Sequence, residues 1–242
     1  MPGQTALRYL EPLESRTRGV AVLDALAGMI ERAGLTVGDR LPPEVALAAQ
    51  LGVGRSTIRE ALNRWEALGI IRRRRGDGTY LSARVQTSQG PLPTMVRLEG
   101  EALLRLLEVR RTLETDVARK AAINATPDQK AEIGRLCDVL LAIIDAGAPY
   151  RDADHAFHGA IAYATGNPMY GQILSRLDDA FEKSYESPFS RNAFGLESFP
   201  LHRDLSDGII AGDADEAAAA INAIIDTVDE EIRQIIGLGP SA

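Results

Sequence analysis

The chain has 242 residues, and its composition, with 45% apolar and 25% charged residues, is typical of a folded globular protein. This composition excludes a largely disordered chain, a collagen-like chain and a bundle of membrane helices. The single cysteine, Cys137, excludes an intrachain disulfide framework and a cysteine-based zinc knuckle, and it fits a reducing compartment. The first residues lack an apolar stretch followed by a small-residue cleavage site, so we expect a cytoplasmic protein with no membrane partner.

The net charge of −7 conceals an asymmetry along the chain. Residues 1–84 carry 13 Arg, no Lys and 9 acidic residues, a net charge of +4, whereas residues 85–242 carry a net charge of −11. A small nucleic-acid-binding module joined to a larger non-binding domain produces this pattern. Chance clustering of arginine would give the same charges, so charge alone does not establish DNA binding.

The N-terminal third has the pattern of three helices followed by a hairpin. Apolar residues recur three and four positions apart in each helical stretch, and a short glycine-containing turn joins the second stretch to the third, as in a helix-turn-helix unit. Two short apolar stretches around a further glycine-containing turn predict a two-stranded wing. The predicted elements are an arm over residues 1–18, helices over about 20–33, 43–51 and 55–68, and a hairpin over 70–81.

The start of the third helix is where a recognition helix meets base edges in the major groove. Arginine pairs bidentately with guanine, and serine or threonine contacts bases or phosphates. The arginine run over residues 72–75 is either a solvated surface or, given its place after this helix, an edge that contacts phosphate. Trp65 falls on the apolar stripe, which favours a core role over base stacking. The residues that we expect at the DNA are Arg55, Ser56, Thr57, Arg59, Arg64, Arg74, Arg75, Gly76 and Gly78.

Residues 38–81 resemble the DNA-binding domain of the GntR family of bacterial transcription regulators. The resemblance implies a winged helix-turn-helix fold and DNA binding. Gly54 stands where the family usually has Ser or Thr, and Val45 stands where many FadR-like members carry a DNA-contacting Arg; both departures bear on the operator sequence. The matching residues are Gly38, Leu41-Pro42-Pro43-Glu44, Leu47-Ala48, Leu51-Gly52-Val53, Arg55, Thr57 to Leu62, Leu68 to Ile71, Gly76, Gly78 and Tyr80-Leu81.

The remaining two-thirds of the chain are helical in pattern. Residues 82–95, rich in Ser, Gln, Gly and Pro, predict a linker, and residues 96–238 predict an all-helical domain. A capping box begins at Thr126, and Asp213 is placed to cap the last helix. The fold class is therefore mainly α: a winged helix-turn-helix of three helices and a two-stranded β wing, joined to an antiparallel bundle of about six helices. The predicted helices cover about 98–122, 127–146, 150–165, 168–184, 196–211 and 213–236.

Asp154 and His158 lie four residues apart, so they share one face of a helix. A carboxylate and an imidazole so placed can bind one divalent metal, and His202 on a later helix could complete a set of three ligands. The same spacing is more often that of a surface ion pair. The residues alone leave both interpretations open.

Residues from about 98 to 236 resemble the FCD effector-binding domain of the FadR subfamily. Members commonly hold a divalent metal such as zinc or nickel with one Asp and three His, which implies Asp154, His158 and His202 as ligands. The position of the remaining His falls near Ile224, which cannot bind a metal. The site therefore either binds metal weakly, or uses an effector carboxylate or water as a further ligand, or is a metal-free polar pocket. The resemblance also implies that Arg110 faces the effector cavity, and an ion pair with Glu114 is its alternative role. The matching residues are Arg110, Leu113-Glu114, Asp154, Phe157-His158, Gly166-Asn167, His202, Ile209 and Gly212-Asp213.

These features predict a dimeric, ligand-responsive transcription regulator. Two winged helices would bind the half-sites of a pseudo-palindromic operator. A small carboxylate effector, bound by Arg110, Asp154, His158 and His202, would release a repressor from its operator. A metal-dependent enzyme and a metabolite-binding protein that does not meet DNA are the alternatives. Against the enzyme, the sequence has no HExxH motif, nucleophile elbow or Walker loop.

Overall fold

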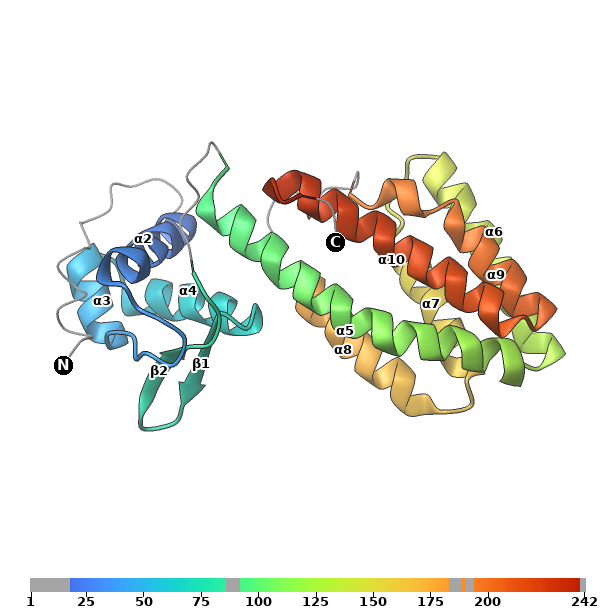
Figure 1. Ribbon diagram of the computed structural model, residues 1–242, viewed down its shortest axis with the longest axis horizontal. Helices are drawn as coiled ribbons and strands as arrows, with labels where there is room; N and C mark the ends of the chain where they lie inside the picture. Colours follow the sequence, from blue (N-terminus) through green and yellow to red (C-terminus); the bar gives the residue numbers. More distant parts are fainter. Residues whose placement is uncertain (1–17, 86–91, 183–188, 190–193, 240–242) are drawn as a thin grey trace. The chain divides into compact units, whose positions relative to one another are not determined.

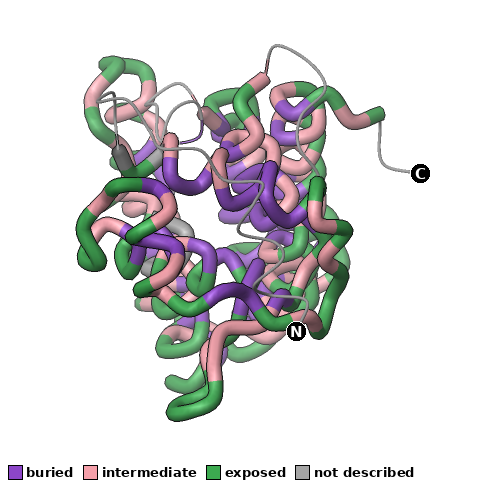
Figure 2. Tube along the Cα trace, turned by 90° about the vertical axis from the view of Figure 1, so that its left-hand side faces the viewer, coloured by how far each residue is buried: buried purple, intermediate pink, exposed green. Residues whose placement is uncertain are grey.

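The computed structural model describes residues 18–85, 92–182, 189 and 194–239, so all but the last residue of the predicted arm lies outside the described part. The chain divides into two compact units, Met1–Ala102 and Leu103–Ala242 (Figure 1). Along each helix buried and exposed residues alternate, as expected where one face of a helix is covered (Figure 2). None of the described helices is long and apolar enough to span a membrane.

The first unit contains the predicted winged helix-turn-helix. Helices α2 and α3 both pack on α4, and the two strands pair antiparallel with Ile71 opposite Leu81 and Arg74 opposite Gly78. The prediction of three helices and a two-stranded wing is confirmed. The elements are α2 (Arg18–Ala33), α3 (Glu44–Leu51), α4 (Arg55–Ala67), β1 (Ile71–Arg74) and β2 (Gly78–Leu81).

The turn between α3 and α4 sets the direction of the recognition helix. Gly52 ends α3 with a φ of 66°, in the left-handed region that favours glycine. Gly54 precedes α4 and supplies no side-chain cap, as its departure from the GntR pattern predicts. Ile58 and Trp65 are fully buried, so the opposite face of α4 is left to solvent. Trp65 is therefore a core residue, as its place on the apolar stripe predicts.

Helix α5 (Thr94–Asn124) begins earlier than the sequence predicts, and its first turns belong to the first unit. Met95 and Leu98 are buried, and the backbone N–H of Met95 donates to the Asp24 carboxylate of α2. The Trp65 Nε1 also lies 3.4 Å from the Met95 sulfur. These tertiary contacts extend the helix into the predicted linker, whose composition gave no sign of them. The division between the units falls after Ala102, inside α5, rather than at the predicted residue 96.

The second unit is the predicted helical bundle. The expected helix over residues 196–211 is divided into a 3-10 turn, η2, and helix α9, because Pro200 lacks the N–H that a continuous helix would use. The bounds after α5 are α6 (Pro127–Asp145), α7 (Arg151–Ala164), α8 (Pro168–Glu182), η2 (Leu196–Ser198), α9 (Leu201–Ala211) and α10 (Ala214–Ile236).

Local caps and side-chain contacts fix the register of the bundle. The capping box of Thr126 and Gln129 opens α6, and the Asp213 carboxylate accepts from two backbone N–H groups of α10, as predicted. Arg111 of α5 donates to Asn222 and Asp226 of α10, at 3.0 and 2.6 Å. This register places the two long helices side by side in the second unit, where Figure 1 shows α10 beside α5.

Candidate DNA-binding surface and metal site

The exposed start of α4 carries the residues predicted to read DNA. Arg55, Ser56 and Arg59 are exposed and Thr57 is half-buried, so all four line the surface opposite the buried face of this helix. A helix N-terminus of this kind can present side chains to base edges. The structure thus places them where base reading requires, and their contact with DNA stays a prediction.

The wing presents a second basic surface. Arg74 and Arg75 are exposed next to the turn, and Gly76 has a φ of 75°, which favours glycine. The Arg74 guanidinium lies 5.0 Å from the centre of the Tyr80 ring, so it is held by a cation–π contact. Gly78 begins β2, and a Cβ there would overlap the Arg40 guanidinium. The Arg74 guanidinium also lies 3.9 Å from the Asp77 carboxylate. The glycines thus suit the tight wing, and phosphate contact by the exposed Arg74 and Arg75 stays a prediction.

Arg64 differs from the other predicted DNA contacts. Its guanidinium donates to the Glu99 carboxylate in α5, and Glu99 is only 1% exposed. The Arg64 side chain itself is 19% exposed. The sequence did not predict Glu99 as its partner, because the two residues lie 35 positions apart and meet only through the packing of α5 on α4. Arg64 therefore has a structural role in the first unit, whatever it contributes to DNA binding.

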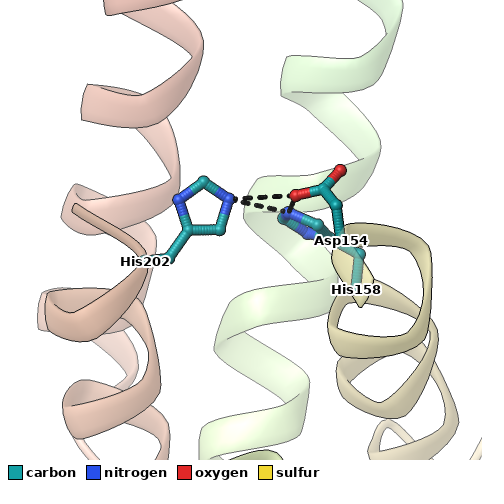
Figure 3. A group of neighbouring side chains, drawn as sticks. All are labelled: Asp154, His158 and His202. Carbon is teal, nitrogen blue, oxygen red and sulfur yellow. Dashed lines mark hydrogen bonds and ion pairs between the residues drawn. The ribbon is translucent and has the colours of Figure 1, made fainter. Parts of the chain in front are cut away.

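The second unit brings Asp154, His158 and His202 together at one point (Figure 3). The Nε2 atoms of the two histidines lie 3.3 Å apart. The Asp154 Oδ1 lies 3.4 Å from the His202 Nε2 and 3.7 Å from the His158 Nε2. One turn of α7 supplies the first two side chains, and the start of α9 supplies the third. Two imidazole nitrogens and one carboxylate oxygen thus converge, as the interpretation as a metal site requires.

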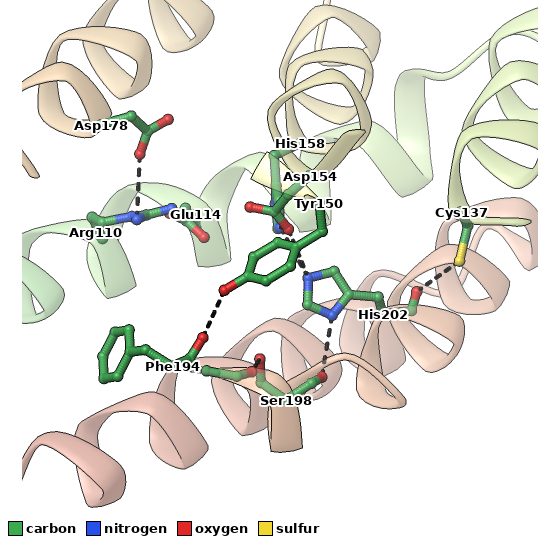
Figure 4. Close-up of polar contacts among 11 residues, drawn as sticks. Arg110, Glu114, Cys137, Tyr150, Asp154, His158, Asp178, Phe194, Ser198 and His202 are labelled. Atoms are coloured by element: carbon green, nitrogen blue, oxygen red, sulfur yellow. Dashed lines mark hydrogen bonds and ion pairs between the residues drawn. The ribbon is translucent and has the colours of Figure 1, made fainter. Parts of the chain in front are cut away.

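The orientation of His202 is set by its surroundings. Its ring stacks on Phe199, with the ring centres 4.9 Å apart, and its Nδ1 lies 3.1 Å from the Ser198 carbonyl oxygen. Because a carbonyl oxygen only accepts, Nδ1 donates this hydrogen bond, and Nε2 is the ring nitrogen that faces Asp154 and His158 (Figure 4). Metal-binding histidines are commonly held by such a hydrogen bond from the second ring nitrogen.

Burial and the neighbouring charges shift the pKa of the Asp154 carboxyl and the pKa of the His158 imidazole. Burial alone would raise the pKa of Asp154, but His158, His202 and Arg110 outweigh it and lower this pKa to about 2. Burial lowers the pKa of His158 below its ordinary value, although Asp154 opposes the shift. Metal ions bind the ionised carboxylate and the neutral imidazole, so both shifts prepare the cluster for a cation.

The position predicted for a further histidine ligand is occupied by Ile224. This residue lines a cavity of about 130 Å³ together with Asp154, His158 and His202. An isoleucine side chain has no atom that can bind a metal, so the described residues offer three ligands there. A fourth position would be open to water or to a ligand in the cavity.

Arg110 lies at the wall of this cavity and of a neighbouring one of about 190 Å³. Its guanidinium forms ion pairs with the Glu114 Oε1 at 2.6 Å and with the Asp178 Oδ1 at 3.3 Å (Figure 4). Arg110 therefore pairs with Glu114 and also lines both cavities, and its contact with an effector stays a prediction. The sequence did not indicate Asp178, which α8 brings in from 68 residues away and whose pKa burial raises.

Comparisons with known proteins agree with these two units. The family models described as "Bacterial regulatory proteins, gntR family" and "FCD domain" match residues 19–81 and 105–227. A regulatory protein of Escherichia coli strain K12, named for the L-lactate dehydrogenase operon, is 32% identical over 88% of this chain and 85% of its own length. The transcriptional regulator LutR of Bacillus subtilis strain 168 is 30% identical, over 84% of this chain and 95% of its own length. A solved GntR structure from Streptococcus agalactiae is 27% identical, covers 88% of this chain and 99% of that chain, and has a TM-score of 0.47.

A winged helix followed by a helical domain with an internal cavity, together with these matches, defines a ligand-responsive DNA-binding transcription regulator. The chain belongs to the gntR family of bacterial regulatory proteins and carries the FCD domain. It is a transcription regulator rather than an enzyme, so the metalloenzyme alternative is not supported.

Proposed function

We propose that this regulator is a homodimeric repressor that binds a pseudo-palindromic operator in the cytoplasm and is released by a small carboxylate bound beside a divalent metal. The single observation that carries the proposal is the convergence of three ligand atoms at the wall of a cavity that also exposes Arg110. A cation at this point would join the effector cavity to α7 and α9, so that ligand binding could alter how these helices pack.

The distances within the cluster fit a tetrahedral ion. Ligand atoms that lie about 2.1 Å from a tetrahedral zinc are about 3.4 Å from one another. The three separations here are 3.3, 3.4 and 3.7 Å. Two nitrogens and one oxygen are also a donor set that zinc and nickel accept. We therefore favour zinc, held by Asp154, His158 and His202, with its remaining position open to the effector or water.

The charges of the cavity wall support a metal-assisted mode of effector binding. Across the two neighbouring cavities, the described lining residues supply three carboxylates, Glu114, Asp154 and Asp178, against the guanidinium of Arg110. A divalent cation would offset this excess and provide the Lewis acid that a carboxylate effector needs. A hydroxyl on the effector could then donate to Glu114 or Asp178. Since one relative is named for the L-lactate dehydrogenase operon, L-lactate is the first effector to test.

The effector proposal is tested by operator binding at fixed salt, with the DNA upstream of the protein's own gene as the probe. We expect L-lactate to lower the affinity at least about fivefold, the lower end of ordinary allosteric coupling. Propionate, which differs from L-lactate only in lacking the hydroxyl, serves as the matched ligand. Removal of metal by a chelator should abolish the response. The proposal fails if no small carboxylate changes operator affinity.

The metal proposal predicts that substitutions of two aspartates in α7 have different effects on zinc affinity. Asp154→Ala removes a ligand and should weaken zinc binding at least about 100-fold. Asp152→Ala removes an exposed carboxylate from the first turn of α7 and should leave zinc affinity within about twofold. Titration calorimetry of the metal-free proteins at pH 7 measures both constants. Equal affinities for the two variants would exclude the cluster as the zinc site.

A further inference from the structure

Glu44, the first residue of α3, connects three elements of the winged helix. Its carboxylate accepts from the Arg59 Nε and Nη2 at 3.3 and 3.1 Å, and its other oxygen lies 3.8 Å from the Arg73 Nη2. Arg59 lies on α4 and Arg73 on β1. One carboxylate is thus shared by the recognition helix and the wing, and no sequence pattern predicts this pairing.

The two arginines of this network differ in what they leave exposed. The Arg73 side chain is 26% exposed and donates to the Arg59 carbonyl oxygen and the Asn63 side chain, so its charge is used inside the domain. The Arg59 side chain is 58% exposed. Strand alternation explains the contrast within the arginine run, because Arg73 faces inward while its neighbours Arg72 and Arg74 face solvent.

The contact between Arg59 and Glu44 uses only one side of the guanidinium. Arginine has five N–H donors in a fixed fork, and Glu44 accepts from Nε and Nη2 along one edge. The edge formed by Nη1 and Nη2 keeps two parallel donors, which is the arrangement that pairs with O6 and N7 of guanine. Glu44 therefore holds the side chain by one edge and leaves the reading edge available.

We propose that Glu44 is a positioning residue that sets DNA specificity by holding the Arg59 guanidinium in its base-reading orientation. This inference rests on the proposal that Arg59 reads base edges. The shared carboxylate also offsets the charge of Arg59 and Arg73, which weakens their attraction to phosphate on any sequence. Loss of Glu44 would free a long, flexible cation that binds phosphate indiscriminately instead of a base in one geometry.

The test compares the full-length protein with Glu44→Gln, using the duplex that the wild-type protein selects from a random library and a scrambled duplex of the same composition. We expect Glu44→Gln to lower the ratio of selected to scrambled affinity about tenfold and to steepen the salt dependence on scrambled DNA. Glu60→Gln is the matched control, because Glu60 is an exposed acid next to Arg59 on α4. It removes the same charge and should leave the ratio unchanged.

A double-mutant cycle separates positioning from a general structural effect. In an Arg59→Ala background, Glu44→Gln should no longer change the affinity ratio, because the residue that Glu44 positions is absent. An equal loss of the ratio in both backgrounds would overturn the inference, as would an unchanged ratio in Glu44→Gln. If Arg59→Ala alone lowers the ratio while Glu44→Gln does not, only the role of Glu44 is wrong. If Arg59→Ala leaves the ratio unchanged, base reading by Arg59 is wrong as well.

Discussion

Charge reversal at Arg55 and Arg59 should abolish sequence-specific DNA binding. Both side chains are exposed on the outer face of α4, and a bidentate arginine–guanine contact is worth about 1–3 kcal/mol. Losing two such contacts and adding two negative charges near phosphate should weaken operator binding at least about 100-fold. The measurement is the equilibrium binding of Arg55→Glu/Arg59→Glu to the selected duplex at one salt concentration.

A second double reversal controls for net charge. Arg105 and Arg176 are exposed on α5 and α8 in the second unit, so Arg105→Glu/Arg176→Glu changes the net charge by the same amount away from the winged helix. We expect the affinity of this variant for the selected duplex to fall by less than about fivefold, through long-range electrostatics alone. If the two double variants lose equal affinity, α4 does not provide the reading surface.

The elements set by local chemistry could be predicted from the sequence. The capping box at Thr126 and the cap at Asp213 mark where α6 and α10 begin, and the glycine after α3 marks the turn before α4. The start of α5 could not be predicted in the same way. It depends on Met95 packing beside Trp65, a contact between residues 30 positions apart that leaves no periodic signal.

The same distinction between local patterns and tertiary contacts applies to the residues of the candidate sites. Asp154 and His158 share a helix face, so their spacing indicates them, and the family resemblance adds His202 from a distant helix. Asp178, Glu44 and Glu99 were missed because each pairs with an arginine on another element. A charged residue in an amphipathic helix has the same pattern whether it faces solvent or a partner, so only the packed structure distinguishes the two.

The contact between Arg64 and Glu99 leads to the second large effect, on stability. Glu99 is 1% exposed, and its Oε2 has no hydrogen-bond partner among the described residues, so its charge depends on the Arg64 guanidinium. Arg64→Met would leave that carboxylate buried without a cation and should lower the free energy of unfolding by about 3 kcal/mol. Glu99→Gln should lower the free energy of unfolding by only about 1 kcal/mol, because the freed arginine can turn towards water and glutamine keeps a hydrogen bond.

The single tryptophan makes this difference measurable. Trp65 neighbours Arg64 in the same helix and is fully buried against Met95, so its fluorescence during urea unfolding reports on the first unit. The double variant Arg64→Met/Glu99→Met should recover most of the free energy of unfolding that Arg64→Met loses. The reason is that an apolar pair of similar volume is often as stable as a buried ion pair. Additive losses in the double variant would show that the two residues stabilise the domain independently. A recovery would show that the two residues are coupled and that the cost of Arg64→Met comes from the unpaired buried carboxylate.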